Sequence, residues 1–337
     1  MSIQALAHSL GISISTVSRA LNGYTDVSAT TRQRVFDAAK ATNYMPHPVA
    51  HRLATGKTGA IAIVNAARSA NAVDGSAAAL HIGVEQALRE HNYFALSLTL
   101  PTGDEEIPEL ERLLAGRLVD GIVLTRTRTN DSRVALLQKR NIPFVTHGRT
   151  VDNASHAWVD TNNEGAFEQA TQALAQRGHR RIAFINGMAH MTFARLREVG
   201  FRKGLQEARL SAGDCPVYYT ELTAQAGQHL ARQLLGEQMH PTAFLCATDA
   251  LALGVMAAVR EMGLIVGKDI SVMGYGNSEA GQFTQPPLAS IDHAIVENGR
   301  HIAQLLLRVM AGESVSDLQV LETPNLILRE SVGKAPI

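Results

Sequence analysis

The strongest constraint on the fold is an alternation of strand-like and helical segments that begins at Gly59. Short apolar runs are separated by segments with helical periodicity, and the alternation starts again after Asn162. Strands that alternate with helices predict parallel, doubly wound sheets, and two such stretches predict two α/β lobes. The first stretch comprises predicted strands 60–64, 93–100, 121–124 and 143–146 with helices 80–91, 105–115 and 131–140. The second comprises strands 181–185, 216–219, 243–246 and 270–273, helices 164–177, 193–208, 226–235, 250–262 and 296–310, and a strand-like tail near Leu318.

Two facing lobes of this kind predict a cleft, because open parallel sheets bind ligands at the carboxyl ends of their strands. Arg126 and Arg128 follow one predicted strand end, and His147 follows the next. Alternate residues of an extended segment point the same way, so both arginines are candidates for the cleft. Asp160 lies near the point where the second stretch begins and is a further candidate.

The first sixty residues predict a separate helical head. A short helix over 3–10 ends at Gly11, because glycine readily adopts the left-handed conformation found at a helix C-terminus. Ser13 then has the position of an N-cap for a second helix over 14–21. Two short helices joined by a tight turn form a helix-turn-helix.

Charge and side-chain placement indicate what the head binds. Residues 1–58 carry six lysines and arginines against two aspartates, whereas the remainder has 25 basic and 29 acidic residues. With a third helix over 30–42, capped by Ser28, the head is a small basic bundle that suits a polyanion such as DNA. The inner side of the second helix would consist of Val17, Ala20 and Leu21. Its outer side would present Ile14, Ser15, Thr16, Ser18 and Arg19 to a groove.

The head resembles that of the lactose-repressor and galactose-repressor family. The resemblance is carried by Ala5-Leu6-Ala7, Gly11-Ile12-Ser13, Arg32-Gln33-Arg34-Val35 and, most specifically, Thr16-Val17-Ser18-Arg19-Ala20-Leu21-Asn22. It implies that Ile14, Ser15 and Arg19 read bases in the major groove, with Arg19 as a bidentate donor to guanine. It also implies that Thr16, Ser18 and Asn22 contact phosphates.

The segment 46–58 is a linker by composition, with prolines near its start and glycine near its end. In the family this segment is a hinge helix that becomes ordered on DNA. The resemblance implies that Leu53 is the leucine that wedges into the minor groove and kinks the duplex. The alternative is that Leu53 is an ordinary packing residue of a tether.

The resemblance extends over nearly the whole chain and implies a core with the periplasmic-binding-protein architecture. Its strongest parts are Gly178-His179-Arg180-Arg181-Ile182, Arg197-x-x-Gly200-Phe201, Asp249-x-x-Ala252-Leu253-Gly254, Asp269-Ile270-Ser271-Val272-x-Gly274-Tyr275 and Gln285-Pro286-Pro287-Leu288-Ala289-Ser290-Ile291. A narrower likeness, to repressors of α-glucoside uptake, lies in residues 125–128, 143–150 and 156–162.

By this resemblance Arg197 and Asp249 hold a carbohydrate effector. An arginine fork and a carboxylate can bracket the vicinal hydroxyls of a sugar as donor and acceptor. The alternative for these two residues is an ion pair on the surface or between the lobes. Gly276-Asn277 replaces the paired acidic residues that are usual in the family, so Asp292 becomes the candidate for an acidic contact.

Several other classes of protein are disfavoured by the sequence. It lacks the glycine-rich, nucleophile-elbow and His-Glu-x-x-His motifs, so neither an enzyme nor a cofactor is expected. Cys215 and Cys246 lack metal-ligand spacing and are expected to pack in a core. Without a signal peptide or an apolar stretch of ~20 residues, a cytoplasmic protein with no membrane partner is expected. A solute-binding protein and a sugar-modifying enzyme are the rival classes.

The resulting expectation is a sugar-responsive transcription repressor in three parts. These are a helix-turn-helix head over 1–45, a hinge helix and linker over 46–58, and a two-lobe core for effector binding and dimerisation over 59–337. Its expected partners are double-stranded operator DNA, an α-glucoside or other di- or oligosaccharide, and a second copy of itself. No heptad seam follows the last core strand, so a homodimer rather than a tetramer is expected.

Overall fold

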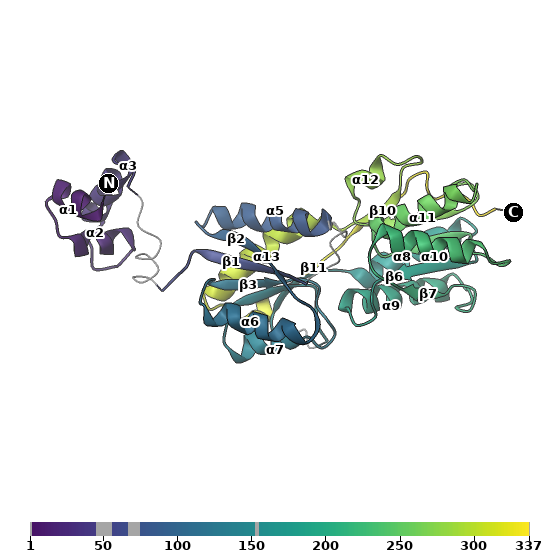
Figure 1. Ribbon diagram of the computed structural model, residues 1–337, viewed down its shortest axis with the longest axis horizontal. Helices are drawn as coiled ribbons and strands as arrows, with labels where there is room; N and C mark the ends of the chain where they lie inside the picture. Colours follow the sequence, from purple (N-terminus) through teal and green to yellow (C-terminus); the bar gives the residue numbers. More distant parts are fainter. Residues whose placement is uncertain (1, 45–55, 67–74, 152–154, 337) are drawn as a thin grey trace. The chain divides into compact units, whose positions relative to one another are not determined.

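The computed structural model describes residues 2–44, 56–66, 75–151 and 155–336. An N-terminal helical head and a core of two α/β lobes are present, which confirms the predicted fold class (Figure 1). The sheet that contains β1 defines the first lobe, and the sheet that contains β6 defines the second. Leu53 and most of the predicted hinge lie outside the described residues.

Three short helices form the head around a small apolar centre. They are α1 (Ile3–Leu10), α2 (Ile14–Leu21) and α3 (Ala29–Ala41). A serine precedes each helix, and its hydroxyl accepts a hydrogen bond from the backbone N–H three residues later, which satisfies one of the free donors of the first turn. Gly11 ends α1 with a φ of 64°, as predicted. Leu6, Val17 and Val35 are fully buried and join the three helices.

The first lobe is a six-stranded sheet in the order β11-β5-β4-β3-β1-β2. Its strands are β1 (Ala60–Ala66), β2 (Phe94–Leu100), β3 (Gly121–Leu124), β4 (Phe144–His147), β5 (Ala157–Thr161) and β11 (Gln319–Glu322). Its helices are η1 (Gly103–Glu105), α5 (Gly75–Arg89), α6 (Glu106–Ala115), α7 (Ser132–Lys139) and α13 (Ile295–Met310). Figure 1 shows α5 and α13 on one face of the sheet and α6 and α7 on the other. A Cβ atom on Gly83 of α5 would lie 1.9 Å from the carbonyl oxygen of Val296 in α13, so glycine allows these helices to touch.

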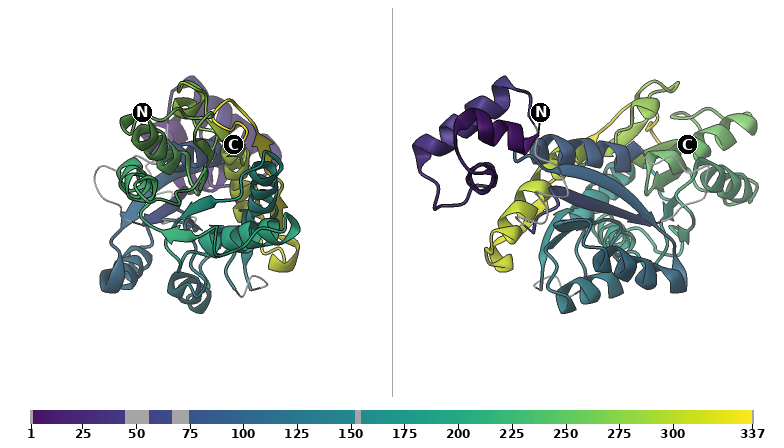
Figure 2. Two further views of the ribbon diagram at one scale, coloured as in Figure 1. Left: turned by 90° about the vertical axis from the view of Figure 1, so that its right-hand side faces the viewer. Right: turned by 60° about the vertical axis from the view of Figure 1, so that its left-hand side comes forward.

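The second lobe is a six-stranded sheet in the order β12-β10-β9-β8-β6-β7. Its strands are β6 (Ile182–Asn186), β7 (Val217–Tyr219), β8 (Ala243–Cys246), β9 (Ser271–Tyr275), β10 (Ala289–Asp292) and β12 (Asn325–Ile327), the last antiparallel to β10. Its helices are α8 (Asn163–Gln176), α9 (Thr192–Glu207), α10 (Ala224–Leu235), α11 (Asp249–Glu261) and α12 (Glu279–Gln282). Helices lie on both sides of this sheet (Figure 2). Cys215 and Cys246 are buried in its core, as predicted.

The lobes are not consecutive halves of the chain, although the sequence pattern restarts only once. After β10, α13 packs against α5 and β11 pairs with β5, so both belong to the first lobe. The 3₁₀ turn η2 (Val315–Asp317) precedes β11, and β12 then closes the second sheet. The sequence pattern does not predict β5 and β10, or the return of the chain to the first lobe. In the described parts of the chain, no helix is both long and apolar enough to cross a membrane.

Candidate nucleic-acid interface and ligand cavity

Helix α2 of the head presents its polar side to solvent. Ile14, Ser15 and Arg19, the predicted base-reading residues, are exposed, whereas Val17 and Ala20 are buried on the opposite side of the helix. The predicted phosphate-contacting residues are half-buried along the same helix and at its end: Thr16, Ser18 and Asn22. The head therefore places the residues predicted to contact DNA on the accessible side of α2.

Hydrogen bonds order the polar groups at both ends of α2. The Ser13 hydroxyl accepts the Thr16 N–H at 3.1 Å and lies 2.8 Å from the hydroxyls of both Ser15 and Thr16. At the other end, Asn22 Nδ2 donates to the Ser18 hydroxyl at 3.3 Å. Four of the side chains predicted to contact DNA, those of Ser15, Thr16, Ser18 and Asn22, thus take part in hydrogen bonds within the head.

The core contains a cavity of ≈ 140 Å³ at the carboxyl ends of its strands. This is the edge at which parallel sheets bind ligands. The first lobe and α5 contribute Asn65, Ser76, Ala77, Leu80, Thr125, Arg126, Thr127, His147, Gly148, Asp160 and Thr161. The remaining lining residues are Asn163, Phe193, Arg197, Leu222, Thr248, Tyr275, His293 and Ile295.

Arg197 is the more deeply buried of the two arginines that line the cavity. Its Nε donates to Asn163 Oδ1 at 2.7 Å, and its Nη1 donates to the Ala247 carbonyl at 2.6 Å. The guanidinium carbon lies 3.7 Å from the ring centre of Tyr275 and 4.7 Å from that of Phe193. Burial lowers the pKa of Arg197, although Tyr275 and Asp160 act in the opposite direction. A buried cation among aromatic rings is thus directed at the cavity.

Asp249 is buried but does not line the cavity. Its carboxylate accepts hydrogen bonds from the Ser290 hydroxyl and the Ser278 N–H, both at 2.6 Å. Burial raises the pKa of Asp249, and these hydrogen bonds only partly oppose that effect. No ion pair among the described residues includes Arg197 or Asp249. The alternative of an ion pair between these two residues therefore does not describe the structure.

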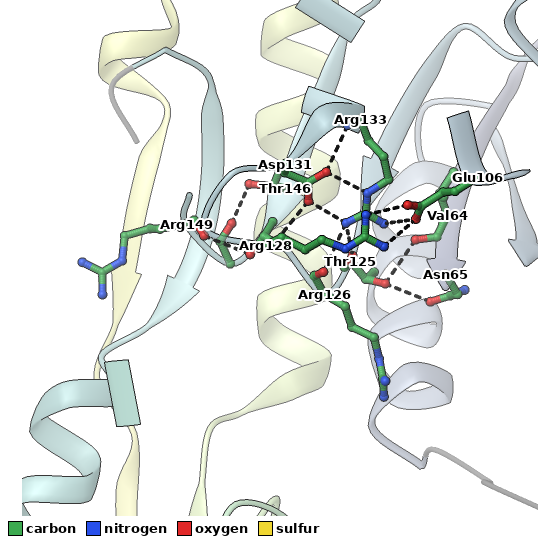
Figure 3. Close-up of polar contacts among 12 residues, drawn as sticks. Val64, Asn65, Glu106, Thr125, Arg126, Arg128, Asp131, Arg133, Thr146 and Arg149 are labelled. Carbon is green, nitrogen blue, oxygen red and sulfur yellow. Dashed lines mark hydrogen bonds and ion pairs between the residues drawn. The ribbon is translucent and has the colours of Figure 1, made fainter. Parts of the chain in front are cut away.

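Arg126 reaches the cavity from a turn with unusual backbone geometry. Its φ is 55°, in the left-handed region that non-glycine residues rarely adopt. Arg133 of α7, which is fully buried, donates through Nη2 to the carbonyl oxygens of Thr125 and Arg126 at 3.2 and 3.1 Å. Figure 3 shows Arg126 extending away from these contacts. The buried arginine thus fixes the backbone of the residue that lines the cavity.

Two buried carboxylates balance the charge of this arginine. Asp131 accepts from Arg133 Nε and Nη2 at 2.9 and 2.7 Å, and also from the backbone N–H of Arg128 (Figure 3). Although burial alone would raise it, Arg133 and these N–H groups hold the pKa of Asp131 below its ordinary value. Glu106, which is 2% exposed, accepts from both terminal nitrogens of Arg128. We call these four residues, Glu106, Arg128, Asp131 and Arg133, the first-lobe charge cluster.

A chain of polar contacts joins Asp160 to Arg197. Asp160 accepts from Arg149 Nε at 2.8 Å and from Asn163 Nδ2 at 3.2 Å. The oxygen of the same Asn163 amide accepts from Arg197. Asn163 therefore contacts both the Asp160 carboxylate, an acceptor, and the Arg197 guanidinium, a donor, in the cavity wall. Asn163 is not among the predicted site residues, and the signal that could have identified it is its place at the start of α8, directly after a strand.

The cavity includes four of the seven predicted effector residues: Arg126, His147, Asp160 and Arg197. The other three, Arg128, Asp249 and Asp292, are engaged elsewhere. Arg128 turns to Glu106, because the left-handed turn at Arg126 breaks the two-residue alternation on which its prediction rests. Asp292 accepts from Asn277 Nδ2 at 3.0 Å, so the asparagine that replaces the family's acidic residue occupies it. The lining residues that the sequence analysis misses include Phe193, Tyr275 and His293.

Backbone hydrogen bonds tie the turn that carries Arg126 to the second lobe. The Thr192 N–H donates to the Thr127 carbonyl at 3.0 Å, and the Thr129 N–H donates to the His190 carbonyl at 3.3 Å. Thr192 is the first residue of α9, the helix that contains Arg197, and His190 lies two residues before it. The two arginines of the cavity are therefore connected through main-chain contacts between the lobes.

Comparison with known proteins gives a consistent family assignment. Residues 2–47 match the family described as bacterial regulatory proteins, lacI family, and residues 171–332 match a periplasmic binding protein-like domain. The HTH-type transcriptional regulator AglR of Rhizobium meliloti (strain 1021) is 35% identical over 348 residues, which cover 100% of this chain and 95% of AglR. The HTH-type transcriptional regulator CelR of Thermobifida fusca is 32% identical over 335 residues, covering 98% of this chain and 97% of CelR.

Solved structures share the fold over almost the full length. A lac repressor dimer bound to operator and the anti-inducer ONPF superposes with a TM-score of 0.82 at 25% identity, covering 98% of each chain. A complex of the transcriptional regulator CelR with cellobiose gives a TM-score of 0.76 at 29% identity, covering 98% of this chain and 99% of that one. The chain therefore shares both its head and its core with these regulators.

Proposed function

Because the chain belongs to the lacI family of bacterial transcription regulators, and is not an enzyme, we propose that it is a repressor controlled by a carbohydrate. The head binds operator DNA through α2, with Arg19 reading guanine. The core binds a sugar in the cavity and changes the operator affinity of the head. The effector class is a di- or oligosaccharide, with α-glucosides as the first candidates because of the sequence resemblance.

One observation carries the carbohydrate assignment. The cavity combines a buried arginine, two aromatic rings and an amide–carboxylate pair: Arg197, Tyr275, Phe193, Asn163 and Asp160. Hydroxyl groups of a sugar need both donors and acceptors, and the apolar faces of its rings pack on aromatic side chains. The relative whose structure was solved in complex with cellobiose is a transcriptional regulator, which supports a sugar of similar size for this chain.

Exposed apolar residues favour a homodimer. Strand β2 is at the edge of the first-lobe sheet, and its Phe94 and Leu96 are 73% and 42% exposed. Exposed apolar residues on an edge strand favour pairing with another chain. The lac repressor that this chain resembles is a dimer on its operator. Sedimentation equilibrium of the full chain should give twice the mass of 36.2 kDa.

Three further parts of the proposal rest on the family resemblance. They are the division into a head over 1–45, a hinge over 46–58 and a core over 59–337, the minor-groove role of Leu53, and a cytoplasmic location, where operator DNA is accessible. The proposed effector roles of Asp249 and Asp292 also rest on this resemblance, whereas that of Arg128 rests on its position after a predicted strand end.

The experiment begins with selection of high-affinity duplexes from a randomised DNA pool by the full-length chain. Fluorescence anisotropy then measures binding of the selected duplex with and without maltose, trehalose, sucrose, cellobiose and raffinose. We expect at least one sugar to change the affinity by roughly 5- to 150-fold, the usual range of allosteric coupling. Sugar binding without selection of any duplex would indicate a solute-binding protein. Chemical conversion of a sugar would indicate an enzyme.

A further inference from the structure

The Arg19 side chain pairs with a carboxylate of the head. Its Nε donates to Asp26 Oδ1 at 3.2 Å, and its Nη2 forms an ion pair with Asp26 Oδ2. The carboxylate therefore engages one edge of the guanidinium, the edge formed by Nε and Nη2. The other edge, which includes Nη1, points away from this contact. Guanine is recognised through two guanidinium N–H groups that reach O6 and N7, so an arginine held in this way keeps donors for a base.

The turn that carries Asp26 is itself fixed to the head. The Val27 N–H donates to the Tyr24 carbonyl at 3.4 Å, and the Tyr24 N–H donates to the Arg19 carbonyl at 3.1 Å. Arg32 of α3 donates through Nη2 to the carbonyl oxygens of Tyr24 and Val27 at 2.6 and 3.4 Å. The Arg19 guanidinium carbon lies 5.4 Å from the ring centre of Tyr24. The turn with Asp26, the helix α3 and the Tyr24 ring thus together favour one orientation of the Arg19 side chain.

We propose that Asp26 is a positioning residue for base recognition, which aims Arg19 at guanine by holding the Nε edge of its guanidinium. This inference rests on the proposed role of Arg19 in reading DNA. The two side chains are about half exposed, at 50% and 49%. A surface ion pair of this kind adds little to folding stability, so its consequence lies in preorganisation. Asp26 fixes the rotamer of Arg19 before DNA binds, and less side-chain entropy is lost at the interface.

The effect of this carboxylate on DNA affinity can be separated from its effect on specificity. A negative charge near the phosphate backbone weakens binding to every duplex, whatever its sequence. Removing Asp26 should therefore leave non-specific binding unchanged or tighter. If Asp26 positions Arg19, the same change should reduce the preference for guanine. If the loss of Asp26 leaves affinity unchanged or raises it while lowering the preference for guanine, the residue positions Arg19 and does not merely repel the phosphate backbone.

The test compares Asp26→Asn with Asp37→Asn in the full-length chain. Asp37 is an exposed aspartate of α3 that accepts a hydrogen bond from Gln33 and is not among the contacts of Arg19. The Asp37→Asn substitution therefore removes the same charge from the head at a site away from Arg19. The probes are the selected duplex, the same duplex with each guanine replaced by adenine, and an unrelated duplex. We expect Asp26→Asn to reduce the preference for one symmetric guanine by about threefold to tenfold, a part of what a bidentate contact provides. Asp37→Asn should leave that preference unchanged.

Arg19→Ala completes the experiment. In the Arg19→Ala background, Asp26→Asn should have no further effect on guanine preference, because a positioning residue acts only through its partner. If Asp26→Asn tightens all duplexes by one factor, or tightens the selected duplex most, the positioning role is wrong. If Arg19→Ala removes guanine preference but Asp26→Asn does not, only the positioning role fails. If Arg19→Ala leaves guanine preference intact, the proposed base contact fails as well.

Discussion

Each lobe of the core buries an arginine and an aspartate, but the two lobes pair these charges differently. In the first lobe, Arg133 donates to Asp131 and lies 3.6 Å from Glu106, so the buried charges compensate one another. In the second lobe, Arg197 and Asp249 contact only carbonyl, amide, hydroxyl and N–H groups in the hydrogen bonds described above. The pKa of Asp131 is lowered, whereas that of Asp249 is raised and that of Arg197 is lowered. These shifts follow the difference in pairing, because burial disfavours a charge that has no opposite partner.

The difference separates a structural role from a binding role. Arg133, which has carboxylate partners, lies behind the cavity wall and fixes its backbone. Arg197, which has none among the described residues, lines the cavity itself. In a buried ion pair, the Coulomb attraction is largely offset by the cost of removing both charges from water. A buried cation that has no carboxylate can still gain by contact with the oxygen atoms of a ligand.

The largest expected effect follows from breaking the compensated cluster. Arg133→Met leaves the buried carboxylates of Asp131 and Glu106 with fewer positive partners, and breaking a buried ion pair typically costs ~3–5 kcal/mol. Urea denaturation should show a loss of this size in the free energy of unfolding. Arg140→Met is the control, because Arg140 forms an exposed pair with Glu111. Equal losses for the two variants would show that the first-lobe charge cluster does not stabilise the lobe.

Replacing the uncompensated arginine should affect sugar binding more than folding. Arg197→Met should weaken sugar binding roughly 10- to 100-fold, since hydrogen bonds to a charged group contribute about 1.5–3 kcal/mol. Operator affinity without sugar should not change. Isothermal titration calorimetry with the most active sugar measures the first quantity. Arg202→Met, on the exposed side of the same helix α9, is the matched control. A full sugar response in Arg197→Met would contradict the proposed effector site.

The two buried aspartates should give opposite pH dependences of stability. The pKa of Asp131 is lowered in the folded chain, so its stabilising contribution is present above its unfolded value of about 3.9 and is lost as the pH falls. The pKa of Asp249 is raised, so the folded chain binds the proton more tightly. The contribution of Asp249 to folding stability therefore increases as the pH falls toward about 3.9 and decreases as the pH rises through its raised pKa in the folded chain.

Thermal melts between pH 3 and 7 test this contrast in the variants Asp131→Asn and Asp249→Asn. Relative to the unmodified chain, Asp131→Asn should reduce the loss of stability on acidification. Asp249→Asn should instead increase that loss, because it removes a group that favours folding at lower pH. The same change of slope in both variants would mean that the two lobes do not differ in how they compensate buried charge.

The sequence predicts the elements of this fold better than their assignment to lobes. Periodicity and caps are local properties, and α1 and α2 begin and end where they are predicted. Which sheet a strand joins depends on contacts between distant segments, such as the approach of Gly83 in α5 to Val296 in α13. Strands β5 and β10 are not predicted, although strands of similar length such as β3 and β8 are. The return of α13 and β11 to the first lobe is therefore absent from the sequence pattern.

The same limit applies to the cavity. Position at a strand end predicts Arg126 and His147, because the carboxyl edge of a parallel sheet is a property of topology. Asp160 is predicted from its place near the start of the second α/β stretch. The partners that orient or divert such side chains come from elsewhere in the chain. Glu106 of α6 binds Arg128 across 22 residues of sequence, and no local pattern announces that contact. The motif residue Tyr275 also lines the cavity, where the Arg197 guanidinium carbon lies 3.7 Å from its ring centre.

The smallest expected effect concerns the turn that the cluster holds. Arg126→Gly and Arg126→Ala both remove a guanidinium from the cavity, and both should weaken sugar binding by the same factor. Only glycine adopts the φ of 55° without strain, and a left-handed residue with a Cβ costs about 1–2 kcal/mol. The glycine variant has the more flexible unfolded chain, which offsets part of this gain. Arg126→Gly should therefore be about 1 kcal/mol more stable than Arg126→Ala in urea denaturation. Equal stabilities would mean that Arg133 and Asp131 do not impose the left-handed turn, and the cluster would then be separate from the cavity.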